Sequence, residues 1–440
     1  MLSGNPYKLI IKFAIPLIIG NVFQQLYNAV DTYVVGKYLG DKAIAAVGAG
    51  FPFLLMMVSI FMGIGMASTV IISQYYGACN YEKLGDTVTT TYIANIIIGV
   101  PMTVIGVLIS KKVLSYVNVP DDGTLDMAGT YLTILFLGII GSVGYNTNAG
   151  ILQGLGDSRS SLLFLIIATI TNIILDVLFV GPLGMGIAGA AIATIISQLF
   201  SWILGIFYIN KHFEYFNMHF LKLKFDKKIF MRTIKLGAPI SIQNAVFSFG
   251  VIVMLNLITS YGSAFMAGYT AANKLDFIIF FSIQSIANAV TTFTGQNYGA
   301  KNVQRINAGL KAGMNISVIT AIVEAIIMLQ FAKPLLKLFV TGQEAVAAGM
   351  AYINQVVPFY FIIAVLFSVN SVLRGMGITM VPMFTTLLSL WLARVPMAYL
   401  IAARFGKYNI FYSYPIGWAI GVIVSGSYYL SGRWKKKLDL

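Results

Sequence analysis

Long, uniformly apolar segments follow one another along almost the whole chain. A membrane-spanning helix needs about 20 consecutive apolar residues, whereas a transmembrane strand needs only about 10 residues of alternating hydrophobicity. The segments are too long and too uniform for a β-barrel. They predict an all-α integral membrane protein with twelve transmembrane helices, at residues 9–35, 43–75, 86–110, 127–153, 161–181, 186–210, 232–259, 264–295, 307–331, 346–373, 380–402 and 411–432.

The composition excludes a water-soluble protein. Of the 440 residues, 58% are hydrophobic and 10% are charged, whereas soluble domains average about 45–50% and about 25%. The net charge of +14 would suggest nucleic acid as the partner of a soluble protein. Here the basic residues are more numerous on the side that holds both termini, so the positive-inside rule predicts cytoplasmic termini in a multi-pass protein of the cell membrane. We expect the lipid bilayer, and no nucleic acid, as a partner.

The longest polar stretch divides the chain almost in half and is rich in Lys and Arg. We predict an N-terminal six-helix lobe at residues 1–210, a basic cytoplasmic linker at 211–231 and a C-terminal six-helix lobe at 232–440. A linker of this charge is expected to lie against anionic lipid headgroups.

The two halves share sequence motifs in the same order. Q-Y-Y-G-A-C-N at 74–80 is repeated as Q-N-Y-G-A-K-N at 296–302, and L-Q-G-L-G at 152–156 is repeated as L-R-G-M-G at 373–377. Because each repeat holds six predicted helices, an even number, both copies start on the same side of the membrane. The lobes are therefore predicted to be parallel repeats related by a pseudo-two-fold axis along the membrane normal, which is a transporter architecture.

Charged residues inside membrane spans cost roughly 2.5–3.5 kcal/mol each on insertion scales and usually mark functional sites. Asp31 on the first span and Asp176 on the fifth lie at similar depth below one membrane surface. Asn172 lies one turn before Asp176 on the same helix face, and Thr194 and Asn146 on neighbouring spans can reach the same layer. Carboxylate, amide and hydroxyl oxygens suit a proton or a hard cation such as Na⁺. For Asn146 and Thr194, an interhelical hydrogen bond is an equal alternative.

Other residues of the first lobe suggest how substrate binding and conformation are linked. Pro16 interrupts the hydrogen bonding of the first span and is a predicted hinge on the helix that carries Asp31. Gln24 lies on the same face as Asp31, and Met57 belongs to a Met-rich run that either lines a cavity or packs in the core. We predict that substrate contacts Gln24, Asp31, Asp176 and Met57.

The second lobe carries Glu324, Arg394, Lys274 and Asp276 within its spans. We interpret them as charge compensation inside the bundle, with gating as the alternative. Both histidines lie in the basic linker and Cys79 is the single cysteine, so we find no catalytic or metal-binding constellation. Nucleotide-binding Gly-rich loops are absent too. The chain is therefore not expected to be an enzyme or to hold a cofactor beyond a coupling ion.

Several longer motifs resemble one known family over the whole chain. They are N-V-F-Q-Q-L-Y-N-A-V-D-T-Y-V-V-G at 21–36, L-Q-G-L-G-D at 152–157, N-I-I-L-D-V-L-F at 172–179 and G-M-G-I-A-G-A-A-I-A-T at 184–194. With the repeated Q-x-Y-G-A motif, they resemble multidrug and toxic compound extrusion (MATE) transporters of the DinF-like prokaryotic branch. The resemblance implies two six-helix lobes and a secondary antiporter that exports amphipathic, often cationic drugs and toxins in exchange for H⁺ or Na⁺ by alternating access.

The resemblance also assigns roles to individual residues. It matches the first-helix acid of the family to Asp31 and the fifth-helix Asn-x-x-x-Asp to Asn172 and Asp176. It matches Thr194 and Asn146 to the remaining ion ligands.

Pro16 matches the proline of the branch's bent first helix, and the seventh span has Gln243 where NorM-like members carry an acid. We therefore expect the ion site in the first lobe and a monomeric protein. A lipid-linked precursor flippase of the same superfamily is the alternative function.

Overall fold

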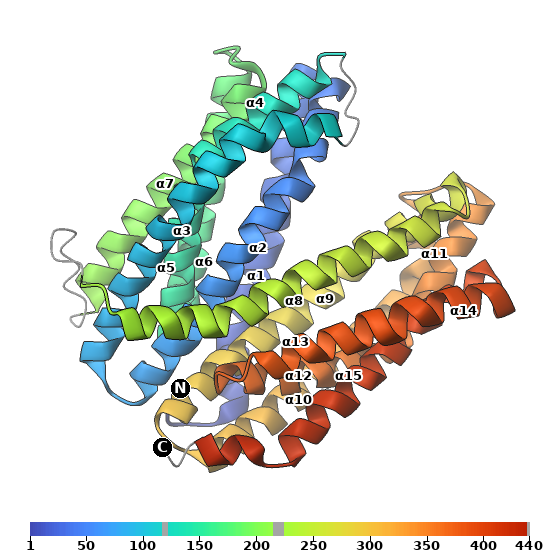
Figure 1. The fold of residues 1–440 in the computed structure, drawn as a ribbon. Coiled ribbons are helices and arrows are strands. Elements are labelled where there is room, and N and C mark those ends of the chain that lie inside the picture. The colour runs from blue at the N-terminus through green and yellow to red at the C-terminus, as the bar shows by residue number, and fades with distance from the viewer. Residues whose placement is uncertain (117–121, 214–223, 438–440) are drawn as a thin grey trace. The chain divides into compact units, whose positions relative to one another are not determined.

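The computed structural model describes residues 1–116, 122–213 and 224–437. The protein is 90% helical, and the described residues contain no strand (Figure 1). The first half holds α1 Pro6–Leu39, α2 Asp41–Gly77, α3 Tyr81–Tyr116, α4 Thr124–Leu137, α5 Ile139–Leu155, α6 Ser158–Val180 and α7 Gly186–His212. The second half holds α8 Lys227–Thr259, α9 Ser263–Gly299, α10 Val303–Lys337, α11 Gln343–Val356, η2 Val357–Phe359, α12 Tyr360–Gly375, α13 Met380–Leu387, η3 Leu388–Arg394, α14 Val395–Phe405, η4 Lys407–Tyr412, α15 Ser413–Leu430 and η5 Arg433–Lys437.

Most of these helices are long and apolar enough to cross a membrane. Within the described ranges there are 11 such helices, or 12 when the pair α4 and α5, bent by 53°, is counted as one broken span. The bend lies at Gly138, where a Cβ atom would come within 2.2 Å of the Ile195 side chain on α7. Close packing of α7 therefore requires glycine at the bend. The predicted all-α membrane fold is confirmed.

The helices form two compact units that do not coincide with the halves of the sequence. One unit is Pro16–Ser241, and the other combines Met1–Ile15 with Ile242–Leu440. Helices α1 and α8 thus each belong to both units, and each carries a proline close to the boundary, Pro16 and Pro239. Of the predicted linker, residues 214–223 lie outside the described residues.

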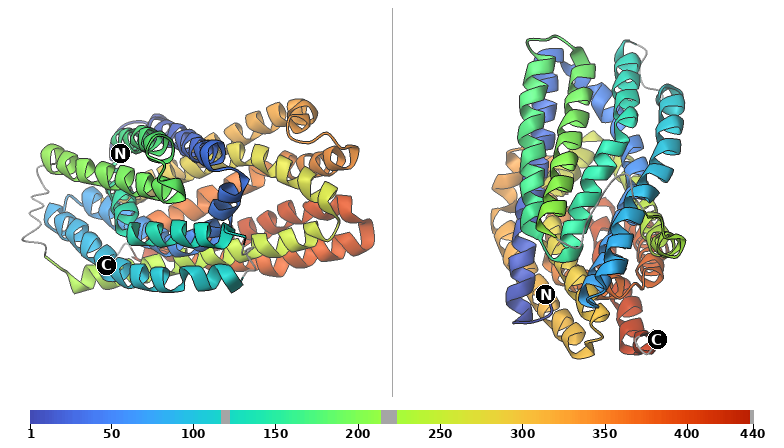
Figure 2. Two further views of the ribbon diagram at one scale, coloured as in Figure 1. Left: turned by 90° about the horizontal axis from the view of Figure 1, so that it is seen from above. Right: turned by 90° about the vertical axis from the view of Figure 1, so that its left-hand side faces the viewer.

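In the first unit, α6 and α7 run side by side (Figure 2, right), and α2 packs on α5. Its hydrophobic clusters include one around Phe136 and Leu132, one around Leu84 and Leu152, and a small one of Ala67, Ile71 and Leu236. In the second unit, α9 packs against α10, α11 and α12 around one large cluster that includes Phe265 and Phe411. Because one side of many helices stays apolar and exposed, as Ile170 and Ile326 do, these sides are free to meet lipid.

The chain around the start of α1 belongs to the second unit, and the start of α8 belongs to the first unit. Hydrogen bonds fix each of these segments to its unit. In the second unit, the Met1 amine donates to Oε1 of Gln296 at 2.6 Å, and the Arg305 guanidinium donates to the Met1 carbonyl at 3.1 Å. In the first unit, Nη2 of Arg232 at the start of α8 donates to Oε1 of Gln74 at 2.5 Å. Gln74 and Gln296 open the two copies of the repeated motif. Both glutamines accept a hydrogen bond from a cationic group, which lies at the start of α8 for Gln74 and ahead of α1 for Gln296.

The first residues of α8 have a second contact. Nζ of Lys83 lies 3.0 Å from Oδ2 of Asp226, just before α8. The Lys83 ammonium holds the pKa of the Asp226 carboxyl below its usual range. The backbone N–H groups of Lys228 and Ile229 also donate to Oδ1 of Asp226, so this carboxylate both caps α8 and ties it to α3.

The repeated Q-x-Y-G-A motif forms a tight turn between two helices. Cys79 and Lys301, at matching positions, have φ of 53° and 54° and are the two non-glycine residues with positive φ in the described ranges. Asn80 and Asn302 then accept the backbone N–H of the third residue of the next helix at 3.1 and 3.0 Å. A left-handed residue followed by an Asn N-cap explains why this motif is found in both halves.

The second repeated motif brings helices into close contact. A Cβ atom on Gly154 would lie 2.9 Å from the Thr69 carbonyl on α2, and one on Gly375 would lie 2.6 Å from the Thr291 carbonyl on α9. Small residues allow such approach between membrane helices. The repeated glycines therefore serve packing.

Candidate functional site in the first unit

Asp31 on α1 and Asp176 on α6 meet inside the first unit. Their carboxyl groups interact directly, although 145 positions separate them in the sequence. Asp31 is 9% exposed and Asp176 is fully buried. None of the ion pairs in the described part of the chain includes either group. Two buried carboxyl groups therefore share one site without a basic partner.

The hydrogen bonding of this site leaves acceptor atoms without donors. Four buried oxygen atoms receive no hydrogen bond when both carboxyl groups are ionised. They are Oδ1 of Asp31, both carboxyl oxygens of Asp176 and Oδ1 of Asn172. Buried oxygens without donors are costly, and two adjacent carboxylates repel each other. A proton held between the carboxyl groups, or a cation bound to these oxygens, would relieve both costs. Carboxylate and amide oxygens of this kind suit H⁺ or a hard cation such as Na⁺ as the bound species.

Hydroxyl and amide groups complete the cluster. Nδ2 of Asn172 lies 3.5 Å from Oγ1 of Thr194, and the hydroxyl of Tyr27 donates to the same Oγ1 at 3.2 Å. Tyr131 on α4 is buried close to both carboxyl groups. The cluster of Asp31, Asp176, Asn172, Thr194 and Tyr27 is called the acidic cluster below. Sequence reasoning missed Tyr27, although it lies one helical turn before Asp31 on α1.

Asn146 does not join the acidic cluster. Its Nδ2 donates to the Ser142 carbonyl at 2.8 Å, one turn earlier on α5, and its side chain is exposed. No hydrogen bond among the described residues links Asn146 to the acidic cluster, and its predicted role as an ion ligand stays a prediction. A helical asparagine can bond to its own backbone four residues back, and the rotation of α5 turns this residue away, which explains the missing bond.

The predicted substrate residues lie in different environments. Gln24 is half-buried on α1, two turns before Asp31, and no hydrogen bond in the described ranges links it to either carboxyl group. Met57 is 9% exposed and belongs to the cluster that includes Val35 and Tyr131. The structure therefore has Met57 as a core residue rather than a residue lining a cavity.

The four charged residues singled out in the spans of the second half form no ion pair with one another in the described part of the chain. No ion pair with any other described residue includes Lys274, Asp276, Glu324 or Arg394 either. Oδ2 of Asp276 accepts the hydroxyl of Tyr352 at 2.8 Å, and Lys274 is exposed with Nζ 5.8 Å from the centre of the Phe339 ring. The charges of Arg394 and Asp276 nevertheless interact with each other, and charge compensation inside the bundle stays a prediction.

A membrane-spanning helical bundle that is duplicated along the chain and buries unpaired carboxyl groups is typical of a transporter rather than an enzyme. The chain belongs to the MATE family, because the family model MatE matches residues 16–178 and again residues 239–400. Its two matched regions are the two copies of the repeat.

Individual relatives agree with this family. The chain is 30% identical over 434 residues to "Probable multidrug resistance protein YpnP" of Bacillus subtilis, covering 98% of this chain and 97% of that protein. It is 26% identical over 330 residues to "DNA damage-inducible protein F" of Escherichia coli, covering 73% of this chain and 70% of that protein. The structure matches "Crystal structure of MATE in the bent conformation" with a TM-score of 0.91 at 24% identity, over 100% of this chain and 98% of that chain. The chain is thus a multi-pass membrane transporter of the multidrug type, and these findings do not favour a lipid flippase.

Proposed function

We propose that this protein is a secondary antiporter that exports amphipathic, often cationic small organic molecules in exchange for H⁺ or Na⁺. The observation that carries the proposal is the acidic cluster. Its two carboxyl groups are buried in membrane-spanning helices without a basic partner. They attract a cation, and they repel each other when both are ionised and no cation is bound. A coupling ion and a cationic substrate would compete for the same negative charge, which is the simplest way to couple their movements.

Helix α1 offers a route from this charge to a conformational change. It carries Asp31, and the boundary between the packing units falls at Pro16 of the same helix. Proline removes one backbone hydrogen bond and favours bending at that point. We infer that the state of Asp31, empty or bound to a cation, biases bending of α1 at Pro16 and so supports alternating access.

The test is efflux from proteoliposomes under separated driving forces. Purified protein is reconstituted, ethidium serves as the lipophilic cation, and either a sodium gradient or a pH gradient is imposed alone. Ethidium movement under one gradient but not under an equal potassium gradient supports ion-coupled export and identifies the ion. Equal rates with and without any ion gradient would exclude antiport.

We also propose a cell-membrane location with both termini in the cytoplasm. The single cysteine makes the topology testable, because Cys79 is free and exposed in the turn between α2 and α3. In this topology a membrane-impermeant maleimide labels Cys79 in inside-out vesicles but not in intact cells. The matched control moves the cysteine to the turn between α8 and α9, where Ser260 is exposed. The Cys79→Ser, Ser260→Cys variant is then labelled in intact cells, and the reverse pattern would invert the topology.

A further inference from the structure

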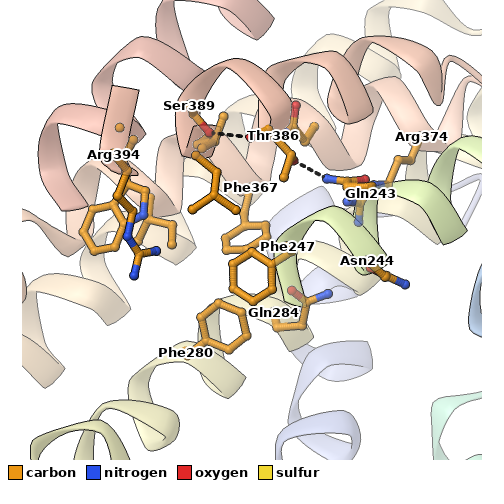
Figure 3. A pocket seen from close by; sticks show the side chains of 16 residues that line it. Gln243, Asn244, Phe247, Phe280, Gln284, Phe367, Arg374, Thr386, Ser389 and Arg394 are labelled. Carbon is orange, nitrogen blue, oxygen red and sulfur yellow. Dashed lines mark hydrogen bonds between the residues drawn. The ribbon is translucent and has the colours of Figure 1, made fainter. Parts of the chain in front are cut away.

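A cavity of about 170 Å³ lies within the second unit, away from every residue of the acidic cluster in the sequence. Its walls come from α8, α9, α12, α13, η3 and α15, and Figure 3 shows the side chains that line it. Aromatic rings of Phe247, Phe280, Phe367 and Trp418 line it together with side-chain amides and hydroxyls. An apolar cavity of about 150 Å³ is known to hold benzene, so this space suits one aromatic ring.

Two buried arginines line the same cavity. Arg394 and Arg374 are each 8% exposed, and Figure 3 places them at opposite sides of the cavity. Nε of each guanidinium is buried without a hydrogen-bond acceptor. Guanidinium groups stay charged in proteins, so each arginine brings a permanent positive charge with unused donor capacity into the cavity.

Arg394 lies near the centre of the 26-residue span Met380–Phe405. Its guanidinium lies over the Tyr414 ring at 3.2 Å, which offsets part of the cost of burial. No hydrogen bond or ion pair of Arg394 occurs among the described residues. A charged residue without an ion pair inside a membrane span is costly, and such residues commonly mark functional sites.

The local backbone explains how Arg394 reaches the cavity. It ends the π-helix η3, in which the N–H of Val395 donates to the Leu390 carbonyl five residues back. Pro396 follows and has no N–H to continue an α-helical ladder, so the wider turn is expected just before it. Helix α15 lies close by, since a Cβ atom on Gly417 would be 2.7 Å from the Ser389 carbonyl. The Arg394 side chain therefore lies between η3 and α15 and stays buried.

Among the described residues, the Arg374 guanidinium has one hydrogen-bond acceptor, and that acceptor is a neutral amide. Nη2 of Arg374 donates to Oε1 of Gln243 at 2.9 Å, and Nε2 of that amide donates to Oγ1 of Thr386 at 2.7 Å. The charge of Arg394 interacts with the buried carboxyl group of Asp276. That carboxyl group accepts the Tyr352 hydroxyl and is not among the residues that line the cavity. The cavity itself thus presents two cations and no carboxylate.

We propose that this cavity binds an organic anion whose carboxylate, sulfonate or phosphate oxygens are attached to an aromatic ring. Arginine presents a planar fork of donors that matches such oxyanions, and the phenyl and indole rings provide faces for stacking. The charge of the cavity is opposite to that of the acidic cluster. The proposal does not rest on ion-coupled export, because binding is measured without transport.

The test measures binding of 4-fluorobenzoate to the purified full-length protein in a neutral detergent by ¹⁹F NMR line broadening. Its neutral isostere 4-fluorobenzamide serves as the comparison, and protein-free micelles correct for partitioning into detergent. The expected result is at least tenfold tighter binding of the benzoate, with displacement by unlabelled benzoate. Equal affinity of the two probes would overturn the proposal without the need for any variant.

Variants locate the site. Arg394→Gln is expected to weaken benzoate binding at least tenfold, and Arg394→Lys is expected to weaken it less because the charge remains. The matched control is Arg404→Gln, an exposed arginine near the end of the same membrane span, which should leave the affinity unchanged. Unchanged affinity in a folded Arg394→Gln protein would refute the assignment. If dioctanoyl phosphatidylglycerol displaces the probe at lower concentration than benzoate does, the site binds a lipid headgroup and the proposal also fails.

Discussion

Replacing Asp176 by Asn tests the central idea about the acidic cluster. The substitution keeps the size of the side chain and a hydrogen-bonding oxygen but removes one of the two charges that meet inside the first unit. The remaining Asp31 then has only neutral neighbours among the hydrogen-bonding groups of the cluster.

The size of the effect follows from Coulomb's law. Two unit charges about 4 Å apart interact by on the order of 4 kcal/mol at an effective dielectric constant of about 20. A cation bound between the carboxylates would lose an attraction of this size, which corresponds to roughly 1,000-fold in affinity. Coupling at ordinary ion concentrations should then cease.

The assay is ethidium efflux from proteoliposomes as the driving ion is titrated. Asp176→Asn and Asp31→Asn should each abolish efflux or shift the half-maximal ion concentration by about three orders of magnitude. The matched control is Asp157→Asn, because Asp157 caps the same helix α6 by accepting the Ser160 N–H at 3.0 Å and Asn is an equally good N-cap. This control should transport as the wild type does. Normal transport with an unchanged ion dependence in both cluster variants would refute the reasoning.

Three smaller effects are expected elsewhere. Tyr27→Phe removes one hydroxyl donor of the acidic cluster. It should weaken binding of the driving ion by about 0.5–1.5 kcal/mol, which raises the half-maximal ion concentration in the same efflux assay by up to about tenfold. An unchanged half-maximal concentration would contradict this. Gly268→Ala would place a Cβ atom 1.9 Å from the Ala345 carbonyl and should lower the melting temperature in detergent clearly, whereas Gly426→Ala, with nothing within 4 Å, should not. Lys301→Gly relieves a left-handed φ of 54° and should raise the melting temperature, since that conformation costs a non-glycine residue roughly 1–2 kcal/mol; a fall would show that the lysine side chain contributes more than the strain removes.

The number, length and order of the helices could be predicted from the sequence. These properties depend on hydrophobicity summed over many residues and on the thickness of the bilayer, so small errors at each boundary do not matter. The duplication was also visible, because the Asn80 and Asn302 caps and the glycines at 154 and 375 are local requirements of turns and close packing. The similar depth of Asp31 and Asp176 could also be predicted, since helix rise fixes the distance of each residue from the membrane surface, but depth alone does not bring their side chains together.

The direction in which each side chain points was decided only by tertiary structure. Asn146 was expected in the acidic cluster and bonds to its own helix instead, while Tyr27, which the sequence analysis overlooked, takes part. Met57 packs in the core, and the unpaired Arg394 faces a cavity that no pattern in the sequence indicated. Hydropathy and helix rise determine how deep a residue lies, but the rotation of a helix about its axis depends on the shapes of all its neighbours, and these are brought together only when the bundle folds.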